Sequence, residues 1–170
     1  MSPLRATLGA IALLLAPVPA TAGARTDDPI LHSKRLWATV NVCDTVGHPD
    51  SIGIRGSMPG DGDKTETMFM RFQVQYFTPD DARWHNLGAQ ADSGFVAVGS
   101  ATRTRQSGIT FTITPPRAGA APYLLRGAVT FEWREAGQVV RRARKSTSTN
   151  HPNTAGADPL GFSAATCSIT

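Results

Sequence analysis

Residues 68–76 read MFMRFQVQY, and this stretch decides the fold class of the chain. Successive side chains of a β-strand point to opposite faces of its sheet. Apolar and polar residues that alternate with period two therefore predict a strand with one buried face and one solvated face. In this stretch the apolar side chains occupy one face, and they are Met68, Met70, Phe72, Val74 and Tyr76. The polar side chains Arg71, Gln73 and Gln75 occupy the other face.

The same alternation continues on both sides of this stretch. It recurs over residues 36–42, 52–58, 109–113 and 123–133, and more weakly over 95–99 and 162–169. Tyr123 and Trp133 stand at the alternate positions of residues 123–133 that are mostly apolar, so we expect both side chains in the core. The segment Glu135-Ala136-Gly137 lies between two strand-like runs and predicts a tight hairpin. We therefore expect an all-β fold, an antiparallel β-sandwich of about seven to nine strands, with a small β-barrel as the alternative.

This pattern also resembles a known architecture. Residues 71–77 (RFQVQYF), Trp84 and the run from Tyr123 through Trp133 are similar to immunoglobulin-like and fibronectin type III-like sandwiches, as found in secreted bacterial proteins. The resemblance implies an immunoglobulin-like β-sandwich. It implies no activity, because such sandwiches host many unrelated functions.

Two features depart from the antibody version of that architecture. Cys43 and Cys167 are 124 positions apart, which is too far for the usual bridge between the two sheets. Ala165 stands two residues before Cys167, where a tyrosine is usual.

The amino terminus has the three parts of a secretory signal. Arg5 supplies the positive charge, and residues 8–16 are apolar. Two small-residue cleavage sites follow, Ala20-Thr21-Ala22 before Gly23 and Ala22-Gly23-Ala24 before Arg25. The apolar run is about half as long as the roughly 20 residues that a membrane-spanning helix needs. We predict a signal peptide over residues 1–24, a flexible leader over 25–35 and a single domain over 36–170. The mature protein is then extracellular or held in the cell envelope, with no transmembrane segment.

Export changes the interpretation of the two cysteines. In an oxidising compartment a lone pair favours a disulfide over two free thiols, so we predict a bond between Cys43 and Cys167. A redox-active pair would lie close in sequence, and this pair does not.

Catalytic and metal motifs are sparse. The sequence has no nucleophile elbow, phosphate-binding glycine loop or zinc-protease motif, so we predict no catalytic residue and no cofactor. His48, Asp50 and His151 are weak candidates for a metal site, since imidazole and carboxylate are suitable ligands. Ordinary turn formation is the favoured interpretation of these residues. Ordinary turn formation is also the favoured interpretation of the acidic residues at Asp61-Gly62-Asp63 and Asp80-Asp81.

Charge is distributed unevenly along the chain. Residues 101–170 carry nine basic and three acidic side chains, whereas residues 23–100 carry seven and ten. The basic residues gather in one expected strand, at Arg141, Arg142, Arg144 and Lys145. On a strand, Arg142 and Arg144 share one face while Arg141 and Lys145 share the other. Such a basic strand suits an anionic partner. It equally suits an edge strand whose charges prevent sheet-to-sheet aggregation.

These observations favour a secreted non-enzymatic binding or structural module. It would present loops and the basic strand to an envelope polymer or an extracellular protein. An extracellular hydrolase with a carboxylate pair is the alternative. Export argues against nucleic acid as the partner.

Overall fold

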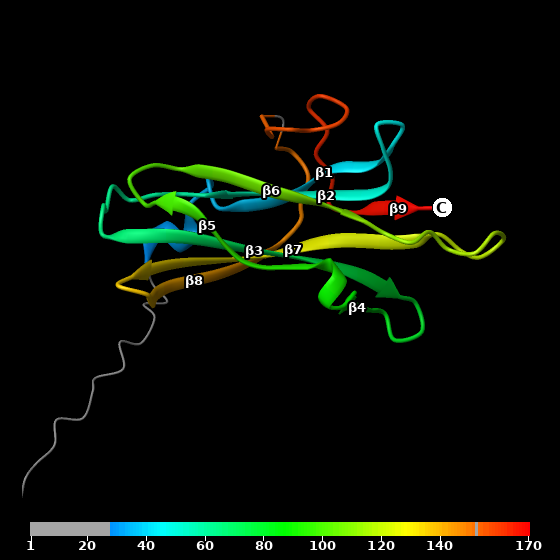
Figure 1. Cartoon of the computed structure of the whole chain (residues 1–170), viewed down its shortest axis with the longest axis horizontal. Coiled ribbons are helices and arrows are strands. Elements are labelled where there is room, and N and C mark those ends of the chain that lie inside the picture. Colours follow the sequence, from blue (N-terminus) through cyan, green and yellow to red (C-terminus); the bar gives the residue numbers. More distant parts are fainter. Residues whose placement is uncertain (1–27, 152) are drawn as a thin grey trace, which may run out of the picture.

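The computed structural model describes residues 28–151 and 153–170. The signal peptide and the first residues of the predicted leader lie outside the described residues. Within the described residues, nine strands form two antiparallel sheets that pack face to face (Figure 1). They are β1 (Trp37–Thr45), β2 (His48–Met58), β3 (Glu66–Thr78), β4 (Arg83–Asn86), β5 (Asp92–Ser100), β6 (Arg105–Thr112), β7 (Tyr123–Glu135), β8 (Gln138–Ser146) and β9 (Cys167–Ile169). The predicted sandwich is confirmed, and the barrel alternative is not what forms.

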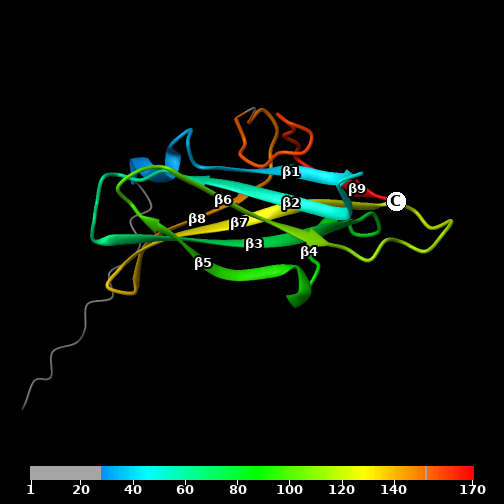
Figure 2. The same cartoon turned by 45° about the horizontal axis from the view of Figure 1, so that its top comes forward.

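The two sheets differ in size. The small sheet has the order β1-β2-β6, and Figure 2 shows its strands running in roughly the same direction as those of the large sheet. The large sheet has β3 and β7 at its centre, paired over eleven residues from Glu66–Glu135 to Tyr76–Leu125. Strands β5 and β4 pair with successive parts of β3, on the side of β3 away from β7. Strands β8 and β9 likewise pair with successive parts of β7, on the side of β7 away from β3.

The core lies between the sheets and is built from the apolar parity of each strand. Phe72, Phe131 and Trp133 are among its largest fully buried side chains. The indole Nε1 of Trp133 donates a hydrogen bond to the Pro59 carbonyl oxygen at 3.1 Å, so the one polar atom of that side chain is satisfied in the core.

Two aromatic residues leave this pattern. Tyr76 and Tyr123 share the apolar parity of their strands, yet they are 37% and 42% exposed. They line an open cavity where β3, β6 and β7 reach the end of the sandwich. The prediction that Tyr123 belongs to the core is therefore wrong, because the strand runs past the region that the small sheet covers.

The packed region begins earlier than residue 36. Within the span predicted as a flexible leader, Pro29–His32 form a 3-10 turn capped by the Asp28 carboxylate. Ile30 and Leu31 pack against the core. In the described part of the chain no helix is long and apolar enough to cross a membrane.

The hairpin between β7 and β8 has the predicted form. Ala136 and Gly137 take positive φ values of 46° and 82°, as a two-residue type I′ turn requires. Glycine adopts this backbone conformation without steric cost, which explains its place at the second position.

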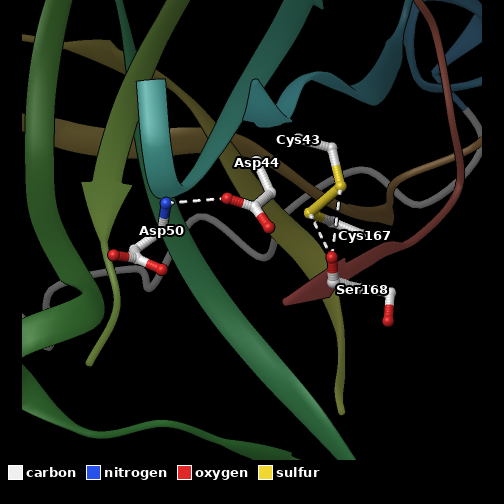
Figure 3. The surroundings of a disulfide bond; sticks show 5 residues. All are labelled: Cys43, Asp44, Asp50, Cys167 and Ser168. Atoms are coloured by element: carbon white, nitrogen blue, oxygen red, sulfur yellow. Dashed lines mark hydrogen bonds between the residues drawn. A yellow bond between two sulfur atoms is a disulfide. The ribbon is translucent and has the colours of Figure 1, made fainter. Parts of the chain in front are cut away.

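The disulfide between Cys43 and Cys167 is present, with a Cα–Cα distance of 5.4 Å (Figure 3). Cys43 lies in β1 of the small sheet, and Cys167 lies in β9, which pairs with β7 of the large sheet. The bond therefore does link the two sheets. The predicted disulfide is confirmed, and it joins β1 to β9 because the chain returns past β1 after crossing the rest of the domain.

Candidate functional site

The four basic residues of the predicted strand divide between the two faces of β8, as their spacing along a strand predicts. Arg141 and Lys145 are in register with Trp133 and Val129, which point into the core. Arg142 and Arg144 are in register with Glu132 and Thr130 on the outer face of the large sheet. The four residues therefore do not form a single surface.

Arg141 is held by acidic residues. Its guanidinium bonds the carboxylates of Asp28 at 2.6 Å, Asp61 at 2.8 Å and Glu66 at 2.5 Å, and its side chain is 17% exposed. Burial raises the pKa of Glu66, and the charge of Arg141 opposes that rise. This cluster ties the amino-terminal turn and the β2–β3 loop to β8. It leaves Arg141 little capacity for an external anion.

The outer face of the large sheet carries most of the remaining arginines. Cross-strand registers bring Arg71 of β3, Thr130 of β7 and Arg144 of β8 into one row. Residues two apart along a strand share a face, so the neighbouring rows add further guanidinium groups. We call this surface the arginine face, and it consists of Arg71, Arg126, Arg134, Arg142 and Arg144.

Aromatic rings lie among these arginines and hold some of them in place. The guanidinium of Arg134 lies 4.2 Å from the ring centroid of Phe69 and 4.8 Å from that of Phe95. Arg126 lies 4.3 Å from the Trp84 ring, and its Nε donates to the side-chain oxygen of Gln75 at 2.9 Å. Planar guanidinium groups stack well on rings, so these two side chains are oriented in advance of any binding.

Two carboxylates compensate part of the charge on the arginine face. Glu132 is fully buried and accepts hydrogen bonds from Arg134 Nε at 2.8 Å and Arg142 Nε at 2.7 Å. Asp92 accepts a hydrogen bond from Arg71 Nε at 2.8 Å, and this partner is the main cause that lowers the pKa of Asp92 to about 2.

The remaining arginines leave an excess of positive charge. Arg144 is exposed and makes no hydrogen bond or ion pair with the described residues. Burial lowers the pKa of Arg126, and the positive charge of Arg144 lowers it further. Five guanidinium groups against two carboxylates make this face an electrostatically favourable surface for anions.

The weak metal candidates do not meet. His48 Nδ1 lies 3.1 Å from the Asp158 carboxylate, whereas His151 stacks on Trp37 with 4.4 Å between ring centroids. The backbone N–H of Asp50 donates to the Asp44 carboxylate in the turn near the disulfide (Figure 3). Across the residues that the structure describes, no group of three or more potential ligands lies close enough to hold a metal ion.

Several cavities open on the described surface. The cavity at the end of the sandwich measures about 360 Å³ and has an apolar wall of Tyr76, Leu87, Ile113 and Tyr123. A polar one of about 360 Å³ lies beside Trp37 and His151, and a smaller one of about 140 Å³ lies over Arg55. The cavities at the end of the sandwich, beside Trp37 and over Arg55 have no aspartate or glutamate in their linings.

Sequence reasoning missed three members of the arginine face, namely Arg71, Arg126 and Arg134. A signal for them exists, because each stands on the solvated parity of its strand. The pairing of β3 with β7 and of β7 with β8 is what places them beside Arg142 and Arg144, and the alternation pattern contains no information on that pairing.

Comparison with known proteins adds no functional evidence. No family model matches the chain, and no protein of described function does. A putative beta-galactosidase from Bacteroides fragilis is similar over 65% of this chain and 15% of its own, with 15% identity and a TM-score of 0.38. The sporulation control protein Spo0M from Bacillus subtilis is similar over 65% and 46%, with 17% identity and a TM-score of 0.25. This chain spans less than half the length of either, and the resemblance to immunoglobulin-like families stays a prediction.

Proposed function

We propose that this protein is a secreted, non-enzymatic module that binds an anionic polysaccharide of the extracellular space or cell envelope through the arginine face. The observation that carries the proposal is the excess of guanidinium groups on one sheet face, where Arg144 has no partner among the described residues. Guanidinium groups match the geometry of carboxylate and sulfate oxygens, which accept two parallel hydrogen bonds.

The shape of the arginine face favours an extended polymer over a small anion. Arg126 and Arg134 are eight residues apart on β7, which corresponds to about 27 Å along the strand. Their charges are therefore spread along the sheet and do not converge on one point. A polysaccharide with repeated negative charges contacts several of them at once.

The aromatic rings support a sugar polymer in particular. Phe77 and Trp84 pack together at one end of the face, with 5.3 Å between ring centroids, and both are half-buried. Rings of this kind offer an apolar surface beside polar groups, which suits the C–H faces of a sugar ring. The rings beneath Arg126 and Arg134 also reduce the entropy that binding must overcome, since those side chains are already ordered.

Secretion rests on the amino-terminal sequence and on the disulfide. A signal-like segment over residues 1–24 precedes a domain that a disulfide cross-links. Disulfides persist in oxidising compartments and are rare in the cytosol.

Extracellular hydrolysis by a carboxylate pair ranks second. Such an enzyme needs two acids that face a substrate cleft. The cavities at the end of the sandwich, beside Trp37 and over Arg55 have no acidic lining, and Asp61 and Glu66 are both bonded to Arg141.

The test is retention of the mature protein on immobilised heparin, a sulfated polysaccharide, in a salt gradient. We compare the wild type with the double variant Arg126→Gln, Arg144→Gln. An exposed ion pair contributes up to about 1 kcal/mol, so losing two weakens binding by up to about thirtyfold at low salt and lowers the eluting salt concentration.

The matched control is Arg103→Gln with Arg117→Gln. Both arginines are exposed in loops away from the arginine face, and the net charge changes by the same amount. Equal retention losses in the two double variants would show that only net charge matters and would refute the proposal. Binding to anionic phospholipid vesicles without retention on heparin would refute it as well.

A further inference from the structure

Arg55 occupies the middle of the small sheet, on the opposite side of the sandwich from the arginine face. It lies in β2 and is in register with Thr39 of β1 and Gly108 of β6. A Cβ on Gly108 would lie 3.2 Å from Arg55 Cδ. The missing side chain at Gly108 therefore leaves the space across which the arginine side chain runs.

The guanidinium group of Arg55 reaches the long loop between β8 and β9. A Cβ on Gly156 would lie 2.8 Å from Arg55 Nη2, so the guanidinium lies directly against the backbone there. The side-chain amide of Asn41 fixes this loop by donating a hydrogen bond to the Gly156 carbonyl oxygen at 2.7 Å. Arg55 is thus half-buried between the sheet and a loop anchored over it.

The charge of Arg55 is not compensated within the described part of the chain. Its Nε is buried without a hydrogen-bond partner, and no carboxylate of residues 28–151 or 153–170 forms an ion pair with it. Arg71, Arg134, Arg141 and Arg142 by contrast each bond a carboxylate. Burial lowers the pKa of Arg55, which reflects the cost of keeping this charge away from water. An anion beside it would offset that cost.

A cavity of about 140 Å³ opens at this position, and its lining is almost entirely polar. The Thr110 hydroxyl and the second N–H of the Asn41 amide supply further donors, because only one amide hydrogen is used by Gly156. The cavity contains no acidic side chain that would repel an anion. It is lined by Asn41, Arg55, Gly108, Ile109, Thr110 and Gly156.

We propose that this cavity is a binding site for a small oxyanion, either free or as the terminal group of a larger ligand, with the Arg55 guanidinium as its main contact. Carboxylate, phosphate and sulfate share the required chemistry, which is two adjacent acceptor oxygens and a negative charge. The site is independent of the arginine face, because it lies on the other sheet and uses none of the same residues.

The experiment is an NMR titration of the mature protein with sodium phosphate, sodium sulfate and sodium acetate in separate arms, against sodium chloride at equal ionic strength. We expect saturable shifts of the Thr110 and Gly156 amide signals with at least one oxyanion and none with chloride. The arm that saturates at the lowest concentration identifies the ligand chemistry. Shifts that never saturate in any oxyanion arm, or that chloride reproduces, would overturn the proposal.

Arg55→Gln should weaken the binding about tenfold or more, because a charge-assisted hydrogen bond is lost. Arg105→Gln is the matched control. Arg105 is another arginine of the small sheet whose buried Nε lacks a partner among the described residues, and it lies in register with Met58 at the far end of β6. Equal losses in both variants would contradict the assignment to Arg55.

A second pair of variants keeps the test decisive if Arg55→Gln does not fold. Thr110 is exposed and shares the face of Arg55, so Thr110→Glu places a carboxylate beside the guanidinium. We expect Thr110→Glu to have a higher melting temperature than Thr110→Gln and to lose the oxyanion response that Thr110→Gln retains. Equal melting temperatures together with an undiminished oxyanion response in Thr110→Glu would refute the site.

Discussion

Replacing Asp92 with asparagine removes a carboxylate that holds together one end of the arginine face. The Asp92 side chain is 16% exposed and accepts hydrogen bonds from Arg71 Nε at 2.8 Å, Gln73 Nε2 at 2.9 Å and the Gly94 backbone at 3.0 Å. The substitution keeps the size of the side chain and removes its charge. It therefore tests how much these charge-assisted bonds stabilise the fold.

The magnitude follows from the pKa of Asp92. Its hydrogen bonds, chiefly the one from Arg71, lower this pKa from 3.8 to about 2 in the folded protein, and each unit corresponds to about 1.4 kcal/mol. A carboxyl whose pKa is lower in the folded state stabilises the fold at all pH values above its unfolded pKa. The stabilisation disappears as the pH falls through the folded pKa. Asp92 therefore contributes about 2 kcal/mol at pH 7, and most of that is lost between about pH 5 and pH 2.

The assay is urea denaturation of the wild type and Asp92→Asn at pH 7, 5, 3 and 2. We expect the difference in free energy of unfolding to be about 2 kcal/mol at pH 7 and 5, and to approach zero at pH 2. Asp80→Asn is the control, since Asp80 is exposed in the turn before β4. A difference that stays constant with pH, or one that Asp80→Asn reproduces, would refute the reasoning.

Three other perturbations test the disulfide, the core and the buried carboxylate. Cys43→Ala with Cys167→Ala opens a loop spanning 124 positions and should lower the free energy of unfolding in urea by about 5 kcal/mol; a loss below about 1 kcal/mol would contradict this. Gly127→Ala puts a Cβ 2.8 Å from Ile54 Cγ2 and should lower the free energy of unfolding by about 1–3 kcal/mol, seen as a lower melting temperature. An unchanged melting temperature would contradict this prediction. Glu132→Gln weakens the bonds to two arginines and should cost about 1–3 kcal/mol, while the greater excess of positive charge strengthens heparin retention; weaker retention would contradict the proposed function.

The fold was predictable because each long strand buries one face. The alternation at residues 68–74 follows directly from that burial, and Met68, Met70, Phe72 and Val74 are buried as predicted. The alternation wrongly predicts that Tyr76 is buried, because the strand continues past the end of the core at that residue. Period two reports which face a residue occupies, and it does not report where the opposing sheet stops.

The candidate site was less predictable because its partners are distant in sequence. Arg141 bonds Asp28 and Glu66, which are 113 and 75 positions away. A register shift between Trp133 and Arg134 also changes which residues of β8 lie opposite β7. Local patterns contain neither fact. Period two places Arg141 and Arg144 on opposite faces of the strand, but it does not show that acids hold Arg141 while Arg144 is open to solvent.

The central claim is that the guanidinium groups on the outer face of the large sheet contact a polyanion. The most direct measurement is NMR observation of the arginine Nε–Hε signals during titration with a heparin oligosaccharide. We predict that the signals of Arg126, Arg142 and Arg144 shift together and saturate, while those of Arg103 and Arg117 stay in place. Equal shifts at all five arginines, or shifts confined to Arg103 and Arg117, would contradict the account.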